Sequence, residues 1–232
     1  MQSPSSANHN INSAVETNIN IILQNAAKRF NRDWIFRKLD YTFSSGKAYA
    51  ITGPNGSGKS TLLQCIAAST QISEGKIEYK TGNREQGTRN KEELLNAENI
   101  FQQSSIVAPY LEVIEEMTAK EFLQFHASFK PLLPNISIDE MIAVIGLEAA
   151  TNKQIRFYSS GMKQRIKLAQ AIFSNVPILL LDEPCTNLDA TGYDLYHKLI
   201  NDYCSSKLII VSSNDKNEYD FCTEKISILD YK

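Results

Sequence analysis

The chain has 232 residues and a formal net charge of -2 at pH 7, and 42% of its residues are hydrophobic. This length predicts one α/β domain with an inserted subdomain, and it leaves ample residues for a buried core. The small net charge gives no overall basic surface, so nucleic acid is not an expected partner.

The cysteines and the apolar runs exclude two further classes. The four cysteines, Cys65, Cys185, Cys204 and Cys222, are widely spaced and form no CxxC pair. A disulfide framework or a zinc site is therefore not expected, which fits a reducing cytoplasm. The apolar runs are far shorter than the ~20 residues of a membrane-spanning helix, so any action at a membrane would require a partner.

The chain opens with a polar segment. Residues 1–18 are rich in Ser and Asn and lack both a hydrophobic period and a signal-peptide core, so we expect a disordered tail. Residues 19–23 and 39–43 have the composition of strands, and turn-prone residues around Asn31 separate them. They predict two strands of a sheet edge.

The most specific motif is Gly53-Pro54-Asn55-Gly56-Ser57-Gly58-Lys59-Ser60-Thr61, between an apolar run and a helical pattern that starts at Leu62. It predicts a phosphate-binding loop, in which backbone N–H groups and the helix N-terminus cradle a β-phosphate. Lys59 would reach the β- and γ-phosphates, and the Ser60 hydroxyl would bind Mg²⁺. The alternative is a glycine-rich turn without a ligand, which the flanking strand and helix disfavour.

Two amphipathic patterns follow in the middle of the chain. Residues 117–129 have apolar positions at helical spacing and end before Pro131. Residues 138–145 predict a second helix, which Gly146 ends. We expect these helices to form a block inserted between the strands of a sheet.

A third helical pattern begins at Tyr158-Ser159-Ser160-Gly161-Met162, with apolar residues along one face and Ser159 as the N-cap. Small residues at a helix N-terminus expose backbone donors, so this turn could bind a γ-phosphate. Taken alone, a capped helix without a ligand is the simpler interpretation.

The apolar residues 178–181 predict a buried parallel strand, and Asp182 and Glu183 follow at its carboxyl end, where open α/β sheets bind ligands. Asp182 would hold Mg²⁺ through its water shell, and Glu183 would polarise an attacking water. The alternative is an ordinary charged strand end, which the phosphate-binding loop disfavours.

The order of these motifs, followed by Thr186-Asn187-Leu188-Asp189, resembles the ATP-binding subunit of an ATP-binding-cassette (ABC) transporter. The resemblance covers about residues 19–232. Its most specific element is the signature turn Ser159-Ser160-Gly161, although Ser160 replaces the usual first glycine and Met162 the usual glutamine. It implies a P-loop NTPase core with a mostly parallel sheet, an N-terminal antiparallel β subdomain and an α-helical subdomain inserted at about residues 112–160.

The resemblance also implies a set of site residues. ATP would be bound by Asn55, Gly56, Ser57, Gly58, Lys59, Ser60 and Thr61. Mg²⁺ would be held at Ser60 and Asp182, and Glu183 would be catalytic. Ser159, Ser160 and Gly161 would bind the ATP of a partner chain, and Asp189 would lie at the dimer interface.

The resemblance places an aromatic ring against adenine at Phe30, with Trp34 as the fallback. The alternative for Phe30 is a core position under the edge sheet. The histidines and the basic residues outside these motifs give no clear prediction of a role in the nucleotide site. His9, His126 and His197 are expected to have surface or packing roles. A solvated face is the main expectation for five basic residues, with contact to phosphate or a partner as the alternative: Lys153, Arg156, Lys163, Arg165 and Lys167.

Two positions depart from the family pattern. Without gaps, the position of the family's glutamine falls on Pro109, which has no side-chain oxygen for Mg²⁺. Gln102 and Gln103 could substitute only in a different register. Asn214 follows the apolar residues 208–211 and stands where the family has its switch histidine. An amide can hydrogen-bond to a γ-phosphate but cannot exchange a proton near neutral pH.

The resemblance, which is closest to short exporter-type subunits, implies an ATPase that powers transport through a separate membrane-spanning subunit. It would be cytoplasmic and peripheral on the inner face of the cell membrane. Two copies, or this chain and a homologous chain, would sandwich two ATP molecules. The alternatives are a nucleotide-gated module with little hydrolysis and a soluble ABC ATPase in cofactor assembly or nucleic-acid processing.

Overall fold

The computed structural model describes residues 17–83 and 92–232. Residues 1–16, most of the predicted tail, lie outside the described residues. Thr17 and Asn18 belong to the first strand instead of the tail, because they pair with Asn83 and Gly82 of a neighbouring strand. The predicted tail boundary at residue 18 is corrected accordingly.

Within the described residues, an antiparallel sheet has the strand order β2-β1-β4-β5. Its strands are β1 (Thr17–Phe30), β2 (Asp33–Ser44), β4 (Glu74–Asn83) and β5 (Glu92–Leu95). β1 and β2 contain the two predicted strand segments, which are confirmed. Asn31 in the turn between them has a left-handed φ of 53°, a conformation that Asn tolerates.

The second sheet is parallel, with the order β6-β7-β8-β3-β9. Its strands are β3 (Ala48–Thr52), β6 (Ser104–Val107), β7 (Ile178–Asp182), β8 (Leu208–Ser212) and β9 (Glu224–Ser227). Every residue of β7 and β8 is buried, as expected for strands that are covered on both faces. The carboxyl ends of all these strands meet at one edge of the sheet.

The α-helices of the described chain are α1 (Lys59–Ile66), α2 (Ala119–Ala127), α3 (Ile138–Val144), α4 (Ser160–Ile172) and α5 (Ala190–Tyr203). Short 3-10 helices span Ala97–Gln102, Glu148–Ala150, Ile155–Phe157, Lys216–Glu218 and Ile228–Tyr231. The helices predicted at residues 117–129 and 138–145 are α2 and α3. Each begins with a capping box, in which a Ser or Thr side chain and a Glu side chain satisfy backbone donors reciprocally.

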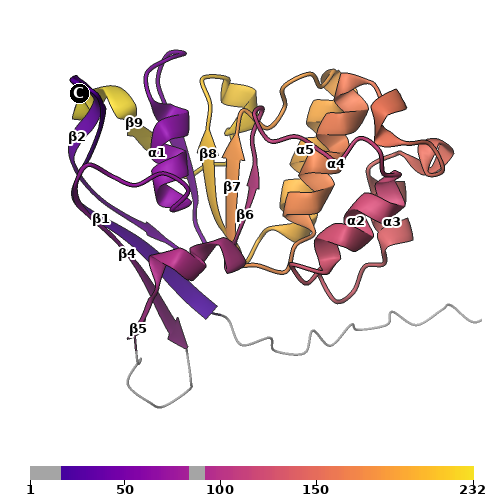
Figure 1. The fold of residues 1–232 in the computed structure, drawn as a ribbon, viewed down its shortest axis with the longest axis horizontal. Coiled ribbons are helices and arrows are strands. Elements are labelled where there is room, and N and C mark those ends of the chain that lie inside the picture. The colour runs from indigo at the N-terminus through magenta and orange to yellow at the C-terminus, as the bar shows by residue number, and fades with distance from the viewer. Residues whose placement is uncertain (1–16, 84–91) are drawn as a thin grey trace, which may run out of the picture.

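Two hydrophobic cores flank the parallel sheet. Because side chains alternate along a strand, Ile178 and Leu180 face the core shared with α1 and the antiparallel sheet, whereas Leu179 and Leu181 face the core under α4 and α5. In Figure 1, α1 and the antiparallel sheet lie on one side of the parallel strands, and the other α-helices lie on the opposite side, with α2 and α3 outermost. The two cores hold the carboxyl edge of the parallel sheet in place.

Candidate functional site

The predicted phosphate-binding loop connects β3 to α1 and packs against β2. Gly58 has a φ of 100°, and a Cβ atom there would lie 2.2 Å from the Ile35 side chain. Gly53 has a φ of 148°, and its Cβ would lie 2.8 Å from Ser57 Oγ. Larger residues rarely adopt these φ angles and would clash, so only glycine fits both positions.

Several donors in this loop are available for a ligand. No side chain caps the N-terminus of α1, which leaves its first backbone N–H groups free of a side-chain partner. The buried Ser57 hydroxyl has no hydrogen-bond partner. Lys59 is 4% exposed, and its Nζ donates to the backbone oxygens of Gly53 and Pro54 at 2.9 and 3.2 Å. Available donors around a buried cation fit an anionic phosphate group.

Ser60 and Asp182, the predicted Mg²⁺ ligands, are in contact. Ser60 Oγ donates to Asp182 Oδ1 at 3.0 Å, and Ser212 Oγ donates to the same oxygen at 2.7 Å. Ser212 ends β8 and pairs in register with Asp182 at the end of β7. Sequence reasoning does not identify Ser212, because a Ser after an apolar strand carries no sign of which strand it will lie beside.

This oxygen-rich corner fits a hydrated Mg²⁺ ion. Hydroxyl and carboxylate oxygens are hard ligands of the kind that Mg²⁺ prefers. In the described part of the chain, no group of three or more His, Cys, Asp or Glu side chains could hold a metal ion. An ion at Ser60 and Asp182 would therefore take its remaining ligands from phosphate and water, as Mg²⁺ usually does in nucleotide sites.

Glu183 leaves the strand in an unusual backbone conformation. Its φ is 43°, in the left-handed region that non-glycine residues rarely adopt. Its backbone N–H donates to the Ser212 carbonyl at 2.9 Å, and its own carbonyl accepts a hydrogen bond from Thr186 Oγ1 at 2.8 Å. Such a conformation costs on the order of 1–3 kcal/mol and persists where the surroundings impose it, often at functional sites. The half-buried side chain follows directly after Asp182.

Asn214 lies beside the phosphate-binding loop. Its Nδ2 donates to Asn55 Oδ1 at 3.1 Å, although the two residues are 159 positions apart in sequence. The contact arises because β3 and β8 are neighbours in the sheet, so the segments that follow them emerge side by side. The amide that stands at the family's histidine position therefore faces the loop in this structure.

Pro109 lies at the same edge of the sheet. β6 pairs with β7 so that Val107 is beside Leu181, and the segment that begins at Ala108 therefore leaves the sheet next to Asp182. Gln102 and Gln103 precede β6, and the Gln103 carbonyl accepts the backbone N–H of Ile178 at the start of β7. They lie at the amino end of these strands, about four residues or 13 Å away from the carboxyl edge, so they cannot replace residue 109.

Phe30 is at the end of β1 and is 49% exposed, so the alternative of a core ring is wrong. Lys28 Nζ lies 4.7 Å from the centre of the Phe30 ring. Trp34, the fallback, is half-buried beside Arg29 and Arg37, whose guanidinium carbons lie 5.4 and 4.6 Å from the ring centre. Phe30 is the more exposed of the two rings, and each ring already has a cation over it.

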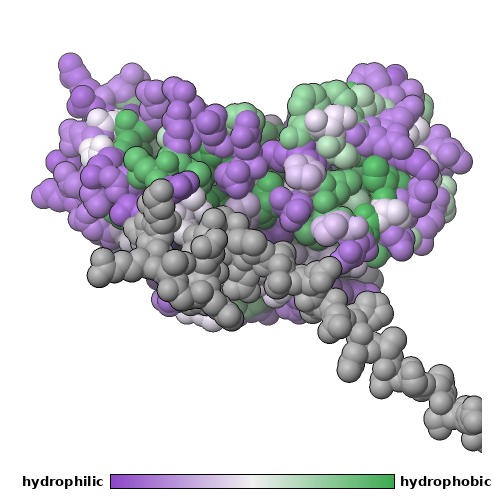
Figure 2. All heavy atoms as spheres, turned by 90° about the horizontal axis from the view of Figure 1, so that it is seen from below, coloured by the Kyte–Doolittle hydropathy of each residue, from purple (hydrophilic) through white to green (hydrophobic). Residues whose placement is uncertain are grey.

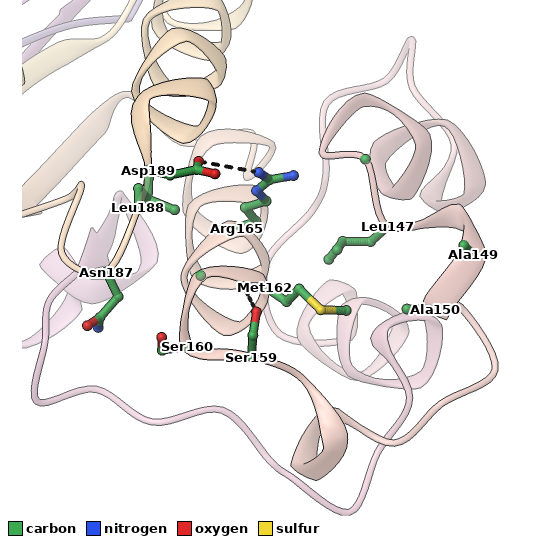
Figure 3. Close-up of a pocket in the computed structure, with 12 residues that line it drawn as sticks. Leu147, Ala149, Ala150, Ser159, Ser160, Met162, Arg165, Asn187, Leu188 and Asp189 are labelled. Atoms are coloured by element: carbon green, nitrogen blue, oxygen red, sulfur yellow. Dashed lines mark hydrogen bonds and ion pairs between the residues drawn. The ribbon is translucent and has the colours of Figure 1, made fainter.

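The signature turn borders a separate pocket of about 400 Å³. Ser159 caps α4 by accepting the backbone N–H of Met162 at 3.3 Å, as predicted. Figure 3 shows Ser159, Ser160 and Asn187 around the start of α4, with Leu147 and Ala150 across the pocket. No residue of the phosphate-binding loop lines this pocket. Within one chain, the structure does not bring these two predicted phosphate-binding elements together.

Asp189 is engaged within its own chain. Its Oδ1 accepts the backbone N–H of Gly192 at 2.8 Å and so caps α5, and Arg165 of α4 lies 3.9 Å from the same oxygen (Figure 3). Hydrogen bonds lower the pKa of Asp189, and the one donated by the Thr191 hydroxyl has the largest effect. Arg165 also donates to the Ile145 carbonyl at 3.5 Å. The prediction that Arg165 belongs mainly to a solvated face is therefore incomplete.

A buried carboxylate that sequence reasoning misses supports the loops after β7 and β8. Glu218 is 4% exposed and accepts the backbone N–H of Cys185 at 2.7 Å. Burial raises the pKa of Glu218, and hydrogen bonds from Ser213 and Cys185 oppose this rise. Glu218 thus joins the segment after Glu183 to the segment that carries Asn214. A single Glu among polar residues gives no sequence signal for this role.

The described histidines contact residues outside this site, whereas the backbone N–H of Cys185 takes part in it. His126 contacts Ser174, and His197 lies 3.5 Å from Asp220, whereas His9 is outside the described residues. All four cysteines are buried and free. Among the described helices, none is both long and apolar enough to cross a membrane.

Comparisons with known proteins agree with this arrangement. The ABC transporter family model matches residues 36–186. An uncharacterised ABC transporter ATP-binding protein of Bacillus subtilis strain 168, YybJ, is 29% identical over 196 residues, which cover 84% of this chain and 85% of the relative. The cytochrome c biogenesis ATP-binding export protein CcmA of Bradyrhizobium diazoefficiens is 31% identical over 179 residues, covering 77% of this chain and 83% of the relative.

Solved structures share the fold. An ABC transporter ATP-binding protein from Pyrococcus furiosus superposes with a TM-score of 0.74 at 18% identity, covering 92% of this chain and 99% of that one. A bacterial ABC transporter cassette solved as a dimer gives a TM-score of 0.68 at 21% identity, with 90% and 94% covered. This chain therefore belongs to the ABC transporter family, as an ATP-binding subunit with the fold of an ABC ATPase.

Proposed function

We propose that this chain binds Mg²⁺ and ATP, hydrolyses ATP to ADP and phosphate, and drives transport through a separate membrane-spanning subunit. The observation that carries the proposal is the meeting of two segments at one edge of the parallel sheet, where Ser60 Oγ donates to Asp182 Oδ1 at 3.0 Å. Lys59 and Ser60 come from the loop after β3, and Asp182 and Glu183 come from the end of β7. A cation, a hydroxyl and two carboxylates are the groups that phosphoryl transfer to water requires.

Each residue would contribute a distinct step. Lys59 exchanges the backbone oxygens of its own loop for the β- and γ-phosphate oxygens. Ser60 and Asp182 hold Mg²⁺, which neutralises phosphate charge when it is bound. Glu183 accepts the proton of the attacking water. Asn214 donates a hydrogen bond from its amide to the γ-phosphate.

The signature pocket supports an assembly of two ATP-binding chains. The N-terminus of α4 at Ser160 has backbone donors, yet no residue of the chain's own phosphate-binding loop reaches its pocket. A homodimer, or a heterodimer with a second ABC ATPase chain, would place each ATP between the loop of one chain and the signature turn of the other. A structural relative, the bacterial cassette, is itself described as dimeric.

Exposed apolar side chains support a partner subunit at the membrane. Phe125 and Phe129 are 43% and 72% exposed, and their ring centres are 5.0 Å apart. Figure 2 shows hydrophobic residues gathered within hydrophilic surroundings on the lower face of the molecule. Exposed clusters of this kind mark interaction sites. With a membrane-spanning partner, the chain would be cytoplasmic and peripheral on the inner face of the membrane.

A second candidate is a nucleotide-gated module with little hydrolysis. Pro109 offers no side-chain oxygen, and Asn214 cannot exchange a proton near neutral pH. In such a module, ATP binding alone would close the assembly. The loop donors and Lys59 would be retained for binding, while turnover would be negligible.

Steady-state ATPase activity of the chain purified with its native partners separates these candidates. We expect an integral membrane protein to co-purify and ATP turnover to be measurable. Tight ATP binding with negligible turnover would favour the nucleotide-gated module. Absence of any membrane chain from the purified complex would favour a soluble ABC ATPase in cofactor assembly.

A further inference from the structure

The segment after β9 packs against the outer side of the phosphate-binding loop. β9 pairs in parallel with β3 so that Ser227 lies beside Thr52. The 3-10 helix Ile228–Tyr231 follows β9 directly, as the loop follows β3, so the two segments leave the sheet side by side. The buried Ile228 side chain lies against Gly53, where an added Cβ would come within 2.8 Å of it. This segment therefore supports the loop from the side.

Lys232 follows this 3-10 helix and bonds to two backbone carbonyls on different elements. Its Nζ donates to the Ser57 carbonyl in the loop at 2.6 Å and to the Ile35 carbonyl in β2 at 2.8 Å. The Ile35 side chain is also the group that a Cβ on Gly58 would meet at 2.2 Å. In Figure 1, the C-terminal end of the chain lies beside β2. Lys232 thus ties the loop to the strand on which it packs.

The hydrogen bond from Lys232 fixes the orientation of one peptide group in the loop. The Ser57 C=O and the Gly58 N–H belong to the same trans peptide group, so they point in opposite directions. Because the carbonyl is directed towards Lys232, the Gly58 N–H is directed away from it. This N–H directly precedes those of Lys59 and Ser60 at the start of α1, which no side chain caps.

The charge of the ammonium group strengthens this effect. A hydrogen bond from a charged donor is stronger than one between neutral groups. A donor on a carbonyl also polarises the peptide group, which makes its N–H a better donor in turn. Lys232 can therefore influence a ligand of the loop without touching it, through the Ser57–Gly58 peptide group.

We propose that Lys232 is a positioning residue of the phosphate-binding loop, which turns the Gly58 N–H towards the β-phosphate of a bound nucleotide. The inference rests on the proposed ATP site. Ile35 lies in β2, which pairs with the strand that carries Phe30. The same ammonium group therefore also links the loop to the hairpin proposed to hold adenine.

Titrations of the full chain with ATP, ADP and AMP test this role. ATP and ADP carry a β-phosphate, whereas AMP lacks one. Lys232→Met keeps an unbranched side chain but loses the ammonium group. We expect its affinities for ATP and ADP to fall about 3- to 10-fold, the effect of one hydrogen bond, while its affinity for AMP stays unchanged. Lys232→Arg retains a cationic donor and should keep the wild-type affinities.

Lys225→Met is the matched control. Lys225 in β9 is exposed, and its Nζ lies 5.2 Å from the centre of the Tyr219 ring, so this variant should keep all three affinities. Unchanged ATP and ADP affinities in Lys232→Met would overturn the inference. An equal loss for AMP would also contradict it, since that indicates a merely structural role, and so would an equal loss in Lys232→Arg. Failure of the wild-type chain to bind ATP and ADP would overturn the ATP site itself.

Discussion

Asn214 is a single residue whose chemistry limits the proposed reaction. Its amide donates to Asn55 and can donate to a phosphate, but it does not titrate near neutral pH. We expect Asn214→Ala to lower ATP turnover about 10-fold or more, because a hydrogen bond to a charged group contributes about 1.5–3 kcal/mol. Asn214→His should keep ATP binding and raise turnover, since an imidazole adds proton exchange.

Steady-state ATPase assays on the wild-type chain and these two variants, with ATP affinity measured in parallel, check this prediction. Equal turnover in all three proteins would remove Asn214 from the mechanism. A loss of affinity equal to the loss of turnover would indicate a role in ATP binding alone.

Lys59 supplies the buried cation of the phosphate-binding loop. Lys59→Ala should weaken ATP binding by about 10- to 100-fold, because the charge-assisted bonds to the β- and γ-phosphates are lost. Lys47→Ala is the control, since Lys47 is exposed and pairs with Glu224 at 3.1 Å. Unchanged ATP affinity in Lys59→Ala, measured by calorimetric titration, would contradict the site assignment.

At the scale of elements, strong local signals were sufficient to predict several parts of the fold. The helices α2, α3 and α4 and the strands β7 and β8 follow from apolar periodicity and from capping residues such as Ser159. β6 escapes this approach because half of its residues are the buried Ser104 and Ser105, which bond to the carbonyls of Ile100 and Ala171. β9 is also short, and Ile226 is its only fully buried residue.

Prediction of the candidate site from the sequence is incomplete for a related reason. Sequence motifs identify Lys59, Ser60 and Asp182, because each of these residues lies in a short run of neighbouring residues with a recognisable pattern. The contacts of Ser212 and Glu218 depend instead on which strands are neighbours and in what register. Side chains that meet through register leave no pattern in one sequence, so only the fold reveals them.

The contact between α2 and the end of α4 predicts a dependence of stability on pH. His126 in α2 donates from Nε2 to Ser174 Oγ at 2.8 Å, because that hydroxyl itself donates to the Gln170 carbonyl. Burial, followed by the charge of Lys130, lowers the pKa of His126 to about 4. In the unfolded chain this histidine takes up a proton near pH 6.5, whereas in the folded chain it stays neutral down to about pH 4. The contribution of neutral His126 to the free energy of unfolding is therefore present above pH 6.5 and is lost as pH falls towards 4.

His126→Gln tests this contact, because Gln can donate a hydrogen bond but does not titrate. Between pH 7 and pH 5, urea unfolding of the wild-type chain should lose about 1 kcal/mol more stability than the variant, after allowance for solvent screening of a half-buried ring. Identical pH dependence of the two proteins would show that His126 does not remain neutral in the folded state.

At the scale of the whole molecule, the two predicted phosphate-binding elements lie at separate places in one chain. The loop after β3 leads to Lys59 and Ser60, whereas the signature pocket is lined by the start of α4, by residues 187–189, and by Gly146, Leu147, Ala149 and Ala150. A second chain is the simplest way to bring a signature turn onto a bound ATP. Hydrolysis would then release the assembly that ATP binding closes, which links turnover to a conformational cycle.

The variant Glu183→Gln should stop this cycle in the closed state. It keeps the shape and hydrogen bonding of the side chain but loses the carboxylate, so turnover should fall about 10²-fold or more while ATP still binds. A stable ATP-dependent dimer should then be detected by light scattering, formed by this chain alone or with its co-purified homologue. Wild-type turnover in the variant would remove Glu183 from the mechanism.

Adding Gly161→Asp to Glu183→Gln tests whether the signature turn forms that interface. A Cβ at Gly161 would lie 3.1 Å from the Asn187 carbonyl, and a carboxylate there would repel the phosphates of a partner's ATP. We expect the dimer dissociation constant to rise at least ~10-fold, about 1.4 kcal/mol, while each chain still binds ATP at its own loop. Gly82→Asp is the control, because a Cβ on Gly82 in β4 meets no atom within 4 Å. Equal dimerisation of the two double variants would show that ATP closes the assembly through another surface.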